Sequence, residues 1–377
     1  MPLTDVTTEK QIHPEDTGFL DMTAYVGGNS TALLEENVWK RLFGEEVPEL
    51  ALLQREKCIA VPKNGACLVR VEQNPVYRNI CMTFSNTTAK AMQVYRISGQ
   101  SLYSGSVKSQ RPQRLSDDLN VPLLYEPSGL QEDPLLSCSI SEEEGLCILS
   151  METDTVYEAE VTEDADFVYV SLVRPYEKYD KIVVLDAGHG GIDIGTSGGG
   201  VTESSINLQV IRYAKEILDE MPEYKIYYTR LDDSLPDLST RVEFANALHA
   251  DFLISVHCNY NSSSSVNGVE VMYSSKQVVD EQFSSRTLAS KCLHAFTEAE
   301  GMKMRECVDR CTNLHLMKYD TMPSVIVEIG FMSNKSDLAK LKKESTKKTC
   351  AETLCRVIEE VYDEWNESFL PPAMPGK

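Results

Sequence analysis

Four residues in the C-terminal half of the chain have the chemistry of a hydrolytic metal site. His189 lies in the glycine-rich segment GHGG, His257 follows the apolar run DFLISV, and Glu328 interrupts the apolar run SVIVEIGF. Glu203 stands where the loop after the first of these segments enters a helical pattern. Two imidazoles and one carboxylate are the ligand set of a hydrolytic zinc ion with an open position for water. Glu328 is left over as the base that such a site needs beside the water.

Local patterns around two of these residues favour the same interpretation. Neighbouring residues of a strand point to opposite faces, so His257 and Asn259 can share the site while Cys258 points away from it. A carboxylate at Glu328, inside an apolar strand, is costly unless a cation or hydrogen bonds accompany it. A zinc ion would be such a partner. His315, in the segment NLHLMKYD upstream of this strand, is a further candidate to approach the site.

Each of the four residues also has a structural explanation. The two histidines fit a glycine turn and a strand end, where an imidazole can bind a backbone carbonyl. Glu203 fits a helix start, where the macrodipole favours a carboxylate. Glu328 could pair with an arginine such as Arg230 or Arg241. For any one of these residues, the structural explanation is the better one. It is a much rarer coincidence, however, that all four residues stand at predicted strand ends or in the first loop.

Other kinds of binding site find no support in the sequence. The string GHGGIDIGTSGGG has Asp193 where the dinucleotide fingerprint G-x-G-x-x-G needs glycine, and no G-K-[ST] follows. The eleven cysteines include no C-x-x-C pair, which argues against a zinc finger. The net charge is −22, of which −14 falls in residues 1–180 and −8 in the rest. Neither half has the basic excess that nucleic acids or anionic membranes attract.

The composition is that of a folded globular protein, with 42% hydrophobic and 25% charged residues. The sequence contains no run of about 18 apolar residues, so we expect no membrane-spanning helix. Its first residues, MPLTDVTTEK, lack the basic and apolar regions of a signal peptide.

Alternating strand and helix patterns position the four candidate residues. The strand patterns are KIVVLDAGHGG, KIYYTR, DFLISVHCN, GVEVMY and PSVIVEIGF, and helical patterns fall at 204–221, 238–248, 284–300 and 346–365. Uniformly apolar strands between helices predict an α/β domain over 181–366, with a mostly parallel open sheet and helices on both faces. Ligands bind at the carboxyl ends of strands in such sheets, where the candidate residues stand.

The preceding residues have a different pattern. Short β-rich runs between turns, such as CLVRVEQ, ICMTFSN, MQVYRIS, CILSMET, VYEAEVT and FVYVSLV, predict an all-β, sandwich-like domain over 55–174. It contains no catalytic constellation. We expect residues 1–54 to form a lead-in with one helix over 31–43. We also expect 175–180 to form a linker and 367–377 a disordered tail.

The order of the motifs in the C-terminal half resembles that of the zinc-dependent N-acetylmuramoyl-L-alanine amidases of the third amidase family, which are bacterial cell-wall hydrolases. The motifs are D-x-G-H-G-G, a glutamate before a helix, S-x-H-x-N and V-E-x-G-F-x-S-N, over about residues 180–366. The resemblance implies Zn²⁺ bound by His189, Glu203 and His257, with Glu328 as the catalytic glutamate. The implied reaction is cleavage of the amide between N-acetylmuramic acid and L-alanine in peptidoglycan.

The resemblance implies several further properties. Asn259 matches a family asparagine near the site, and Arg230 and Arg241 match positions that we interpret as mainly structural. Ser204 stands where the family often has lysine or arginine. The expected location is extracellular or in the cell envelope, and the β-rich half is a candidate wall-targeting domain. Two alternatives stay open: a zinc peptidase acting on wall or other peptides, and a wall-binding protein without catalysis.

Overall fold

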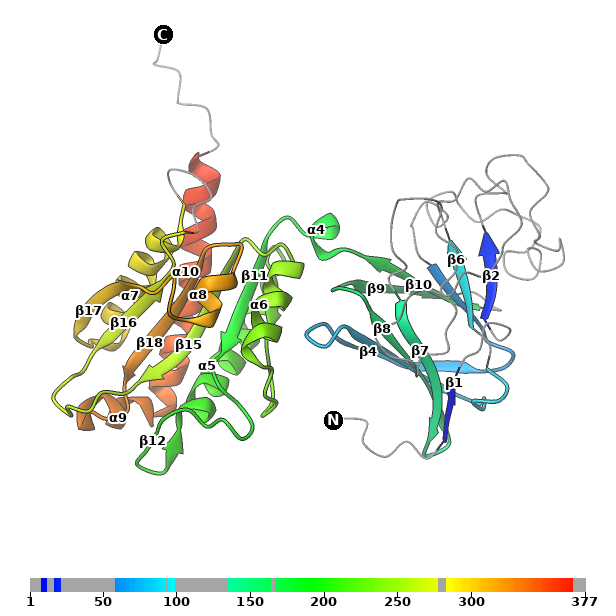
Figure 1. The fold of residues 1–377 in the computed structure, drawn as a ribbon, viewed down its shortest axis with the longest axis horizontal. Helices are drawn as coiled ribbons and strands as arrows, with labels where there is room; N and C mark the ends of the chain where they lie inside the picture. Colours follow the sequence, from blue (N-terminus) through cyan, green and yellow to red (C-terminus); the bar gives the residue numbers. More distant parts are fainter. Residues whose placement is uncertain are drawn as a thin grey trace, which may run out of the picture. The chain divides into compact units, whose positions relative to one another are not determined.

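The computed structural model describes residues 8–11, 17–21, 58–92, 94–98, 135–163, 167–276 and 283–368. The chain divides into two compact units, Met1–Pro175 and Tyr176–Lys377 (Figure 1). The helix predicted over 31–43 lies outside the described residues. Residues 369–377 of the predicted tail also lie outside the described residues. The first two residues of that tail, 367 and 368, belong to the last helix, which ends at Ser368.

Two five-stranded sheets form the N-terminal unit (Figure 1), in the orders β1-β7-β8-β5-β4 and β2-β6-β3-β10-β9. The strands are β1 (Thr8–Gln11), β2 (Thr17–Asp21), β3 (Cys58–Pro62), β4 (Cys67–Asn74), β5 (Asn79–Ser85), β6 (Val94–Ser98), β7 (Leu135–Glu143), β8 (Leu146–Thr153), β9 (Glu158–Glu163) and β10 (Phe167–Val173). Neighbouring strands are antiparallel except β2 and β6, which are parallel. Val61 and Val170 from one sheet pack with Phe84 and Leu149 from the other in a single core. This packing confirms the predicted sandwich.

Two strands of the sandwich come from the predicted lead-in. Strand β1 pairs with β7, and β2 pairs with β6. Their sequences, TEKQ and TGFLD, are short and lack the alternation of apolar and polar residues that indicates a strand. Pairing with neighbouring strands rather than local pattern therefore defines these strands.

A six-stranded sheet is the centre of the C-terminal unit, in the order β14-β11-β15-β18-β16-β17. The strands are β11 (Ile182–Ala187), β14 (Lys225–Tyr228), β15 (Phe252–Asn259), β16 (Val269–Tyr273), β17 (Met304–Asp309) and β18 (Ser324–Phe331), and a small hairpin joins β12 (Ser197–Gly198) to β13 (Val201–Thr202). All neighbours in the six-stranded sheet are parallel except β16 and β18. The predicted mostly parallel sheet is confirmed, with β17 as an additional strand.

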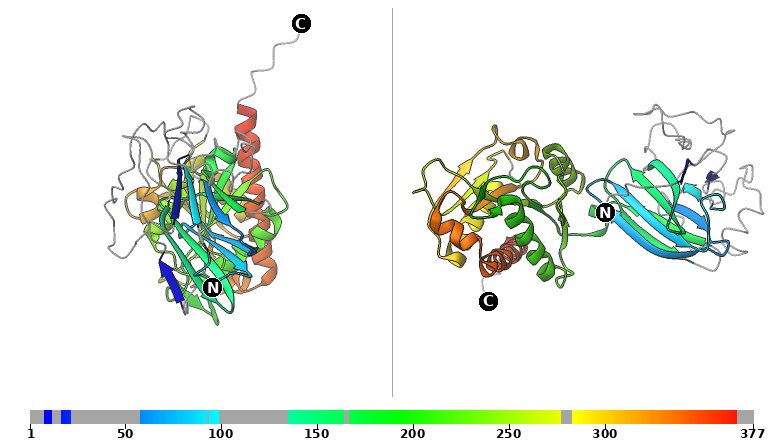
Figure 2. Two further views of the ribbon diagram at one scale, coloured as in Figure 1. Left: turned by 90° about the vertical axis from the view of Figure 1, so that its right-hand side faces the viewer. Right: turned by 90° about the horizontal axis from the view of Figure 1, so that it is seen from below.

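Helices cover both faces of this sheet (Figure 2). The helices that follow β11 are α5 (Glu203–Leu218), α6 (Leu238–Ala247), α7 (Ser285–Glu300), α8 (His315–Tyr319), α9 (Lys335–Leu341) and α10 (Glu344–Ser368). The predicted linker contains a short helix, α4 (Pro175–Lys178). Helices α5, α7 and α10 share one core with alternate strand residues such as Val183, Ile254 and Val327. Helices α6 and α8 contact each other, and their buried residues are not part of that core. Among the described helices, none has both the length and the apolarity to cross a membrane.

Candidate metal centre

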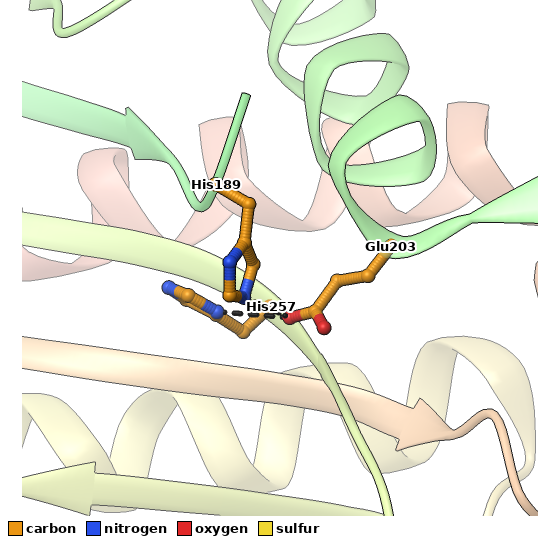
Figure 3. Close-up of side chains that lie close together, drawn as sticks. All are labelled: His189, Glu203 and His257. Carbon is orange, nitrogen blue, oxygen red and sulfur yellow. Dashed lines mark hydrogen bonds and ion pairs between the residues drawn. The ribbon is translucent and has the colours of Figure 1, made fainter. Parts of the chain in front are cut away.

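Three of the predicted site residues lie together at the carboxyl end of the sheet (Figure 3). Glu203 Oε1 is 3.1 Å from His189 Nε2 and 2.9 Å from His257 Nδ1. One potential ligand atom from each of the three residues lies within 4.8 Å of the others. His189 follows β11, Glu203 begins α5, and His257 belongs to β15. The cluster therefore joins segments that are far apart in the sequence.

Glycines allow these side chains to approach one another. A Cβ atom at Gly188 would lie 2.3 Å from the His257 ring, and one at Gly195 would lie 2.5 Å from Glu203 Oε2. His189 itself has a left-handed backbone, with φ of 63°. This conformation costs a non-glycine residue free energy, so neighbouring contacts must stabilise it.

Two buried arginines provide such contacts. Arg241 donates hydrogen bonds to the carbonyl of His189 at 2.8 Å and to the Asp186 carboxylate at 2.5 Å. Arg230 donates to the carbonyl of Gly188 at 3.0 Å. Burial raises the pKa of Asp186, but the Arg241 charge and two hydroxyl hydrogen bonds outweigh it and lower that pKa to about 2. The pairing of Glu328 with either arginine, considered above as an alternative, is therefore wrong.

The electrostatics of the cluster suit a cation. Burial opposes ionisation of Glu203, but hydrogen bonds from His189 and His257 outweigh it and lower the pKa of this carboxyl. Burial lowers the pKa of His189, whereas Glu203 and Asp193 raise it to about 9 overall. Asp193 Oδ2 lies 2.8 Å from His189 Nδ1 and so directs Nε2 toward Glu203. Two imidazoles and an ionised, buried carboxylate are a donor set that fits zinc.

Glu328 lies beside this cluster and has a different environment. It is the register partner of His257 on β15, and on its other side it is the register partner of Glu270 on β16. Its side-chain atom Oε2 is buried and has no hydrogen-bond partner among the described residues. Burial is the largest cause that raises the pKa of Glu328 to about 7, and the nearby charges of Glu203 and Glu270 add to it, while His257 opposes it. A carboxyl group with this pKa can both accept and return a proton near neutral pH.

The other predicted site residues do not belong to the cluster. Asn259 Oδ1 accepts a hydrogen bond from the backbone amide of Tyr260. His315 Nε2 lies 3.4 Å from Ser239 Oγ, and its ring lies 4.6 Å from the Tyr319 ring. Both remain predictions as substrate-binding residues. Cys258 is buried, with Sγ 3.6 Å from Asn207 Oδ1, as expected for a side chain that points away from the metal.

Sequence reasoning missed three acidic residues that shape this site. Asp186 and Glu270 stand inside otherwise apolar strands, which is the same signal that identified Glu328. Asp193 stands four residues after His189 in a polar loop, where nothing in the pattern distinguishes it from a solvated turn residue. Asp186 and Glu270 could have been found by searching every predicted strand for an acidic residue among apolar ones.

Comparison with known proteins finds relatives for about half of the chain. Residues 183–360 match the model of the family described as N-acetylmuramoyl-L-alanine amidase. The chain is 33% identical over 184 residues to the protein YqiI of Bacillus subtilis, covering 49% of this chain and 86% of YqiI. It is 31% identical over 185 residues to the endolysin of Bacillus phage SPP1, covering 48% of this chain and 66% of the endolysin.

Two further matches are named as N-acetylmuramoyl-L-alanine amidases. The N-acetylmuramoyl-L-alanine amidase LytC of Bacillus subtilis is 31% identical over 172 residues, which cover 46% of this chain and 34% of LytC. Among solved structures, the catalytic domain of CwlV, an N-acetylmuramoyl-L-alanine amidase from Bacillus (Paenibacillus) polymyxa var. colistinus, matches with a TM-score of 0.45 and 32% identity. That match covers 48% of this chain and 98% of the CwlV chain.

Proposed function

The chain belongs to the N-acetylmuramoyl-L-alanine amidase family, and we propose that it hydrolyses the amide between N-acetylmuramic acid and L-alanine in peptidoglycan with a zinc ion. His189, Glu203 and His257 hold the metal, and Glu328 is the catalytic acid and base. The enzyme acts on the cell wall, outside the cell or in its envelope. Relatives that are named N-acetylmuramoyl-L-alanine amidases support this substrate, and the proposed location follows from the substrate.

One observation supports the proposal most directly. A cluster of two imidazoles and an ionised carboxylate lies beside a second carboxylate, Glu328, which is 8% exposed. In the part of the chain that the structure describes, one buried oxygen of Glu328 has no hydrogen-bond partner. Such a buried acid destabilises the fold unless something binds it. A water molecule and a polarised substrate amide would satisfy this oxygen during the reaction.

Each side chain of this site has a different role in amide hydrolysis. When bound, zinc supplies a Lewis acid that acidifies water and polarises the amide carbonyl. Asp193 holds the His189 ring with Nε2 toward the cluster. Glu328 accepts the proton of the attacking water at its carboxylate and then donates this proton to the departing nitrogen of L-alanine. The pKa of about 7 for Glu328 suits both transfers.

Digestion of purified wall fragments tests the reaction. The zinc-loaded full chain should release stem peptides with a free L-alanine amine and leave the sugar strands intact, as mass spectrometry can establish. New amines at other peptide bonds would instead indicate a zinc peptidase. Binding to intact wall without any cleavage would indicate a non-catalytic wall-binding protein.

Two variants test the assignment of roles. Glu328→Gln should keep zinc but lose turnover by about 10²–10⁴-fold, since this is the usual contribution of a positioned acid and base. His189→Ala should lose zinc as well, which metal analysis of the purified variant would detect. Glu364→Gln, at an exposed ion pair with Lys291, is the control and should change neither property. Unchanged amide cleavage by Glu328→Gln would refute its catalytic role.

A further inference from the structure

A partly buried ion pair next to Glu328 has no part in the mechanism described above. Glu270 is the register partner of Glu328, and its side chain is 11% exposed. Arg305 on β17 donates from Nε to Glu270 Oε2 at 3.0 Å. Residues directly opposite in a sheet point to the same face. A polar row therefore crosses the sheet from His257 through Glu328 and Glu270 to Arg305.

The backbone of β17 places Arg305 in this row. Val269 pairs with Met304, but Val271 pairs with Cys307, so β17 has one extra residue beside Glu270. An extra residue of this kind re-aims a side chain, and such bulges are common next to active sites. Without the shift, strand alternation would put Arg305 on the same face as Cys307, which packs against the apolar core.

Two contacts fix the guanidinium of Arg305. Glu270 accepts the Nε hydrogen bond, and the guanidinium carbon lies 5.2 Å from the centroid of the Phe331 ring. A ring at this distance favours a cation over its face. The plane of the guanidinium group is therefore set before any ligand arrives, which reduces the entropy lost on binding.

The outer end of Arg305 remains available. Its side chain is 24% exposed, and neither terminal nitrogen has a hydrogen-bond partner among the described residues. Four N–H groups of a rigid, planar fork therefore have no partner among the described residues. Such a fork matches the two oxygens of a carboxylate, which it binds with two parallel hydrogen bonds.

We propose that Arg305 binds a free carboxylate of the stem peptide, on the second or third residue after the scissile amide. This inference rests on the proposed amidase function. Strands β18 and β17 are two strand spacings apart, or about 10 Å. An extended peptide spans this distance in about three residues. Stem peptides have free carboxylates at these positions unless they are amidated, and a chain of net charge −22 needs a local cation to hold them.

A purely structural role for the ion pair makes a different prediction. If Arg305 only neutralised Glu270, its loss would change the cleavage of all substrates by the same factor. If Arg305 binds the substrate carboxylate, its loss must change the cleavage of carboxylate substrates more than that of their carboxamides. The ratio of the two rates therefore separates the roles, whatever happens to overall activity.

The experiment uses two soluble muramoyl-peptides that differ only at the second stem residue, with a free carboxylate or a carboxamide, and a second pair that differs in the same way at the third. The zinc-loaded full chain should cleave the acid of one pair with a kcat/KM about 10–100-fold above that of the amide, the range of a charge-assisted hydrogen bond. Arg305→Gln should abolish this preference. Arg356→Gln, which removes another partly exposed arginine paired with a glutamate, should keep it.

A double variant and the result for the wild-type chain make the outcome decisive. The double variant Glu270→Gln/Arg305→Gln removes both charges of the ion pair, so no Glu270 carboxylate is left without its partner, and it should lose the preference in the same way. A preference that persists in both variants would overturn the proposal, as would equal cleavage of acid and amide by the wild-type chain, a result that needs no variant. Cleavage of both substrates at the L-alanine amide without preference would leave the amidase function intact while rejecting the role of Arg305.

Discussion

The two units of the chain bury different polar side chains. Within the described residues of the sandwich, the buried polar side chains all have hydroxyl groups, namely Thr83, Ser141, Thr153 and Ser171. The α/β unit buries charged ones, including Asp186, Glu203, Arg230, Arg241, Glu270 and Glu328. A hydroxyl can be satisfied by one nearby carbonyl, whereas a charge needs an opposite charge or several hydrogen bonds.

The partners of these charges distinguish structural from functional burial. Asp186 is matched by Arg241, and Glu203 by two imidazoles. Glu328 alone among these acids keeps a buried oxygen without a hydrogen bond among the described residues. The two units therefore differ in buried charge, and this difference supports the proposed site residues of the α/β unit.

The largest expected effect comes from breaking a buried pair. Arg241→Met leaves the Asp186 carboxylate without its counter-charge, so the α/β unit should lose about 3–5 kcal/mol of unfolding free energy. Lys63→Met in the sandwich breaks the Lys63–Glu163 pair, in which Glu163 is half exposed, and should cost less than about 1 kcal/mol. Hydrogen exchange measured by mass spectrometry reports on each unit separately. Similar losses in the two units would show that the buried Asp186–Arg241 pair stabilises its unit no more than the partly exposed Lys63–Glu163 pair does.

The sequence predicted the surroundings of the Asp186–Arg241 pair but not the pair itself. The alternating strands and helices of the α/β unit, and the meeting of His189, Glu203 and His257 at one sheet end, could be predicted because apolar runs and strand-end positions are local features. The structural role of Asp186 could not be predicted in this way, because it depends on Arg241, which lies 55 residues later.

Other features depended on contacts between distant segments. Strand β17 has the sequence MRECVD, whose mixed charges conceal a strand that forms only beside β16. The antiparallel pairing of β16 with β18 likewise leaves no local signature. Because Glu270 and Arg305 face each other only through these pairings, the ion pair beside Glu328 could not be predicted from local pattern.

A smaller effect is expected where a charge supports the metal indirectly. Asp193→Asn removes the carboxylate that orients the His189 ring, and such partners typically contribute 10–100-fold, or about 1.4–2.7 kcal/mol, to metal affinity. Competition with a chelator of known affinity measures this change. Asp219→Asn, at an exposed helix pair with Lys215, is the matched control and should bind zinc as the wild type does. Equal affinities of the two variants would show that the His189 ring needs no carboxylate partner.

Acid should weaken the α/β unit through Asp186. Its pKa is lowered from 3.8 to about 2 in the folded chain, so its contribution is complete above about pH 4 and is lost as the pH falls through 2. The loss amounts to about 2 kcal/mol. Denaturant unfolding followed by hydrogen exchange at pH 5 and pH 2 measures it, with the sandwich as internal reference. Asp186→Asn should reduce the pH dependence by that amount, and an unchanged dependence would locate the acid sensitivity elsewhere.

The smallest effect is expected from removing the sandwich. His189, Glu203, His257 and Glu328 all belong to the unit Tyr176–Lys377, so residues 176–377 alone should cleave a soluble muramoyl-peptide within about twofold of the full chain. Insoluble wall offers the contrast, because a domain that only targets the wall raises the local substrate concentration and leaves kcat on soluble fragments unchanged. A large loss on the soluble substrate would mean that the sandwich contributes to catalysis, and the difference in buried charge would no longer separate a catalytic unit from an accessory one.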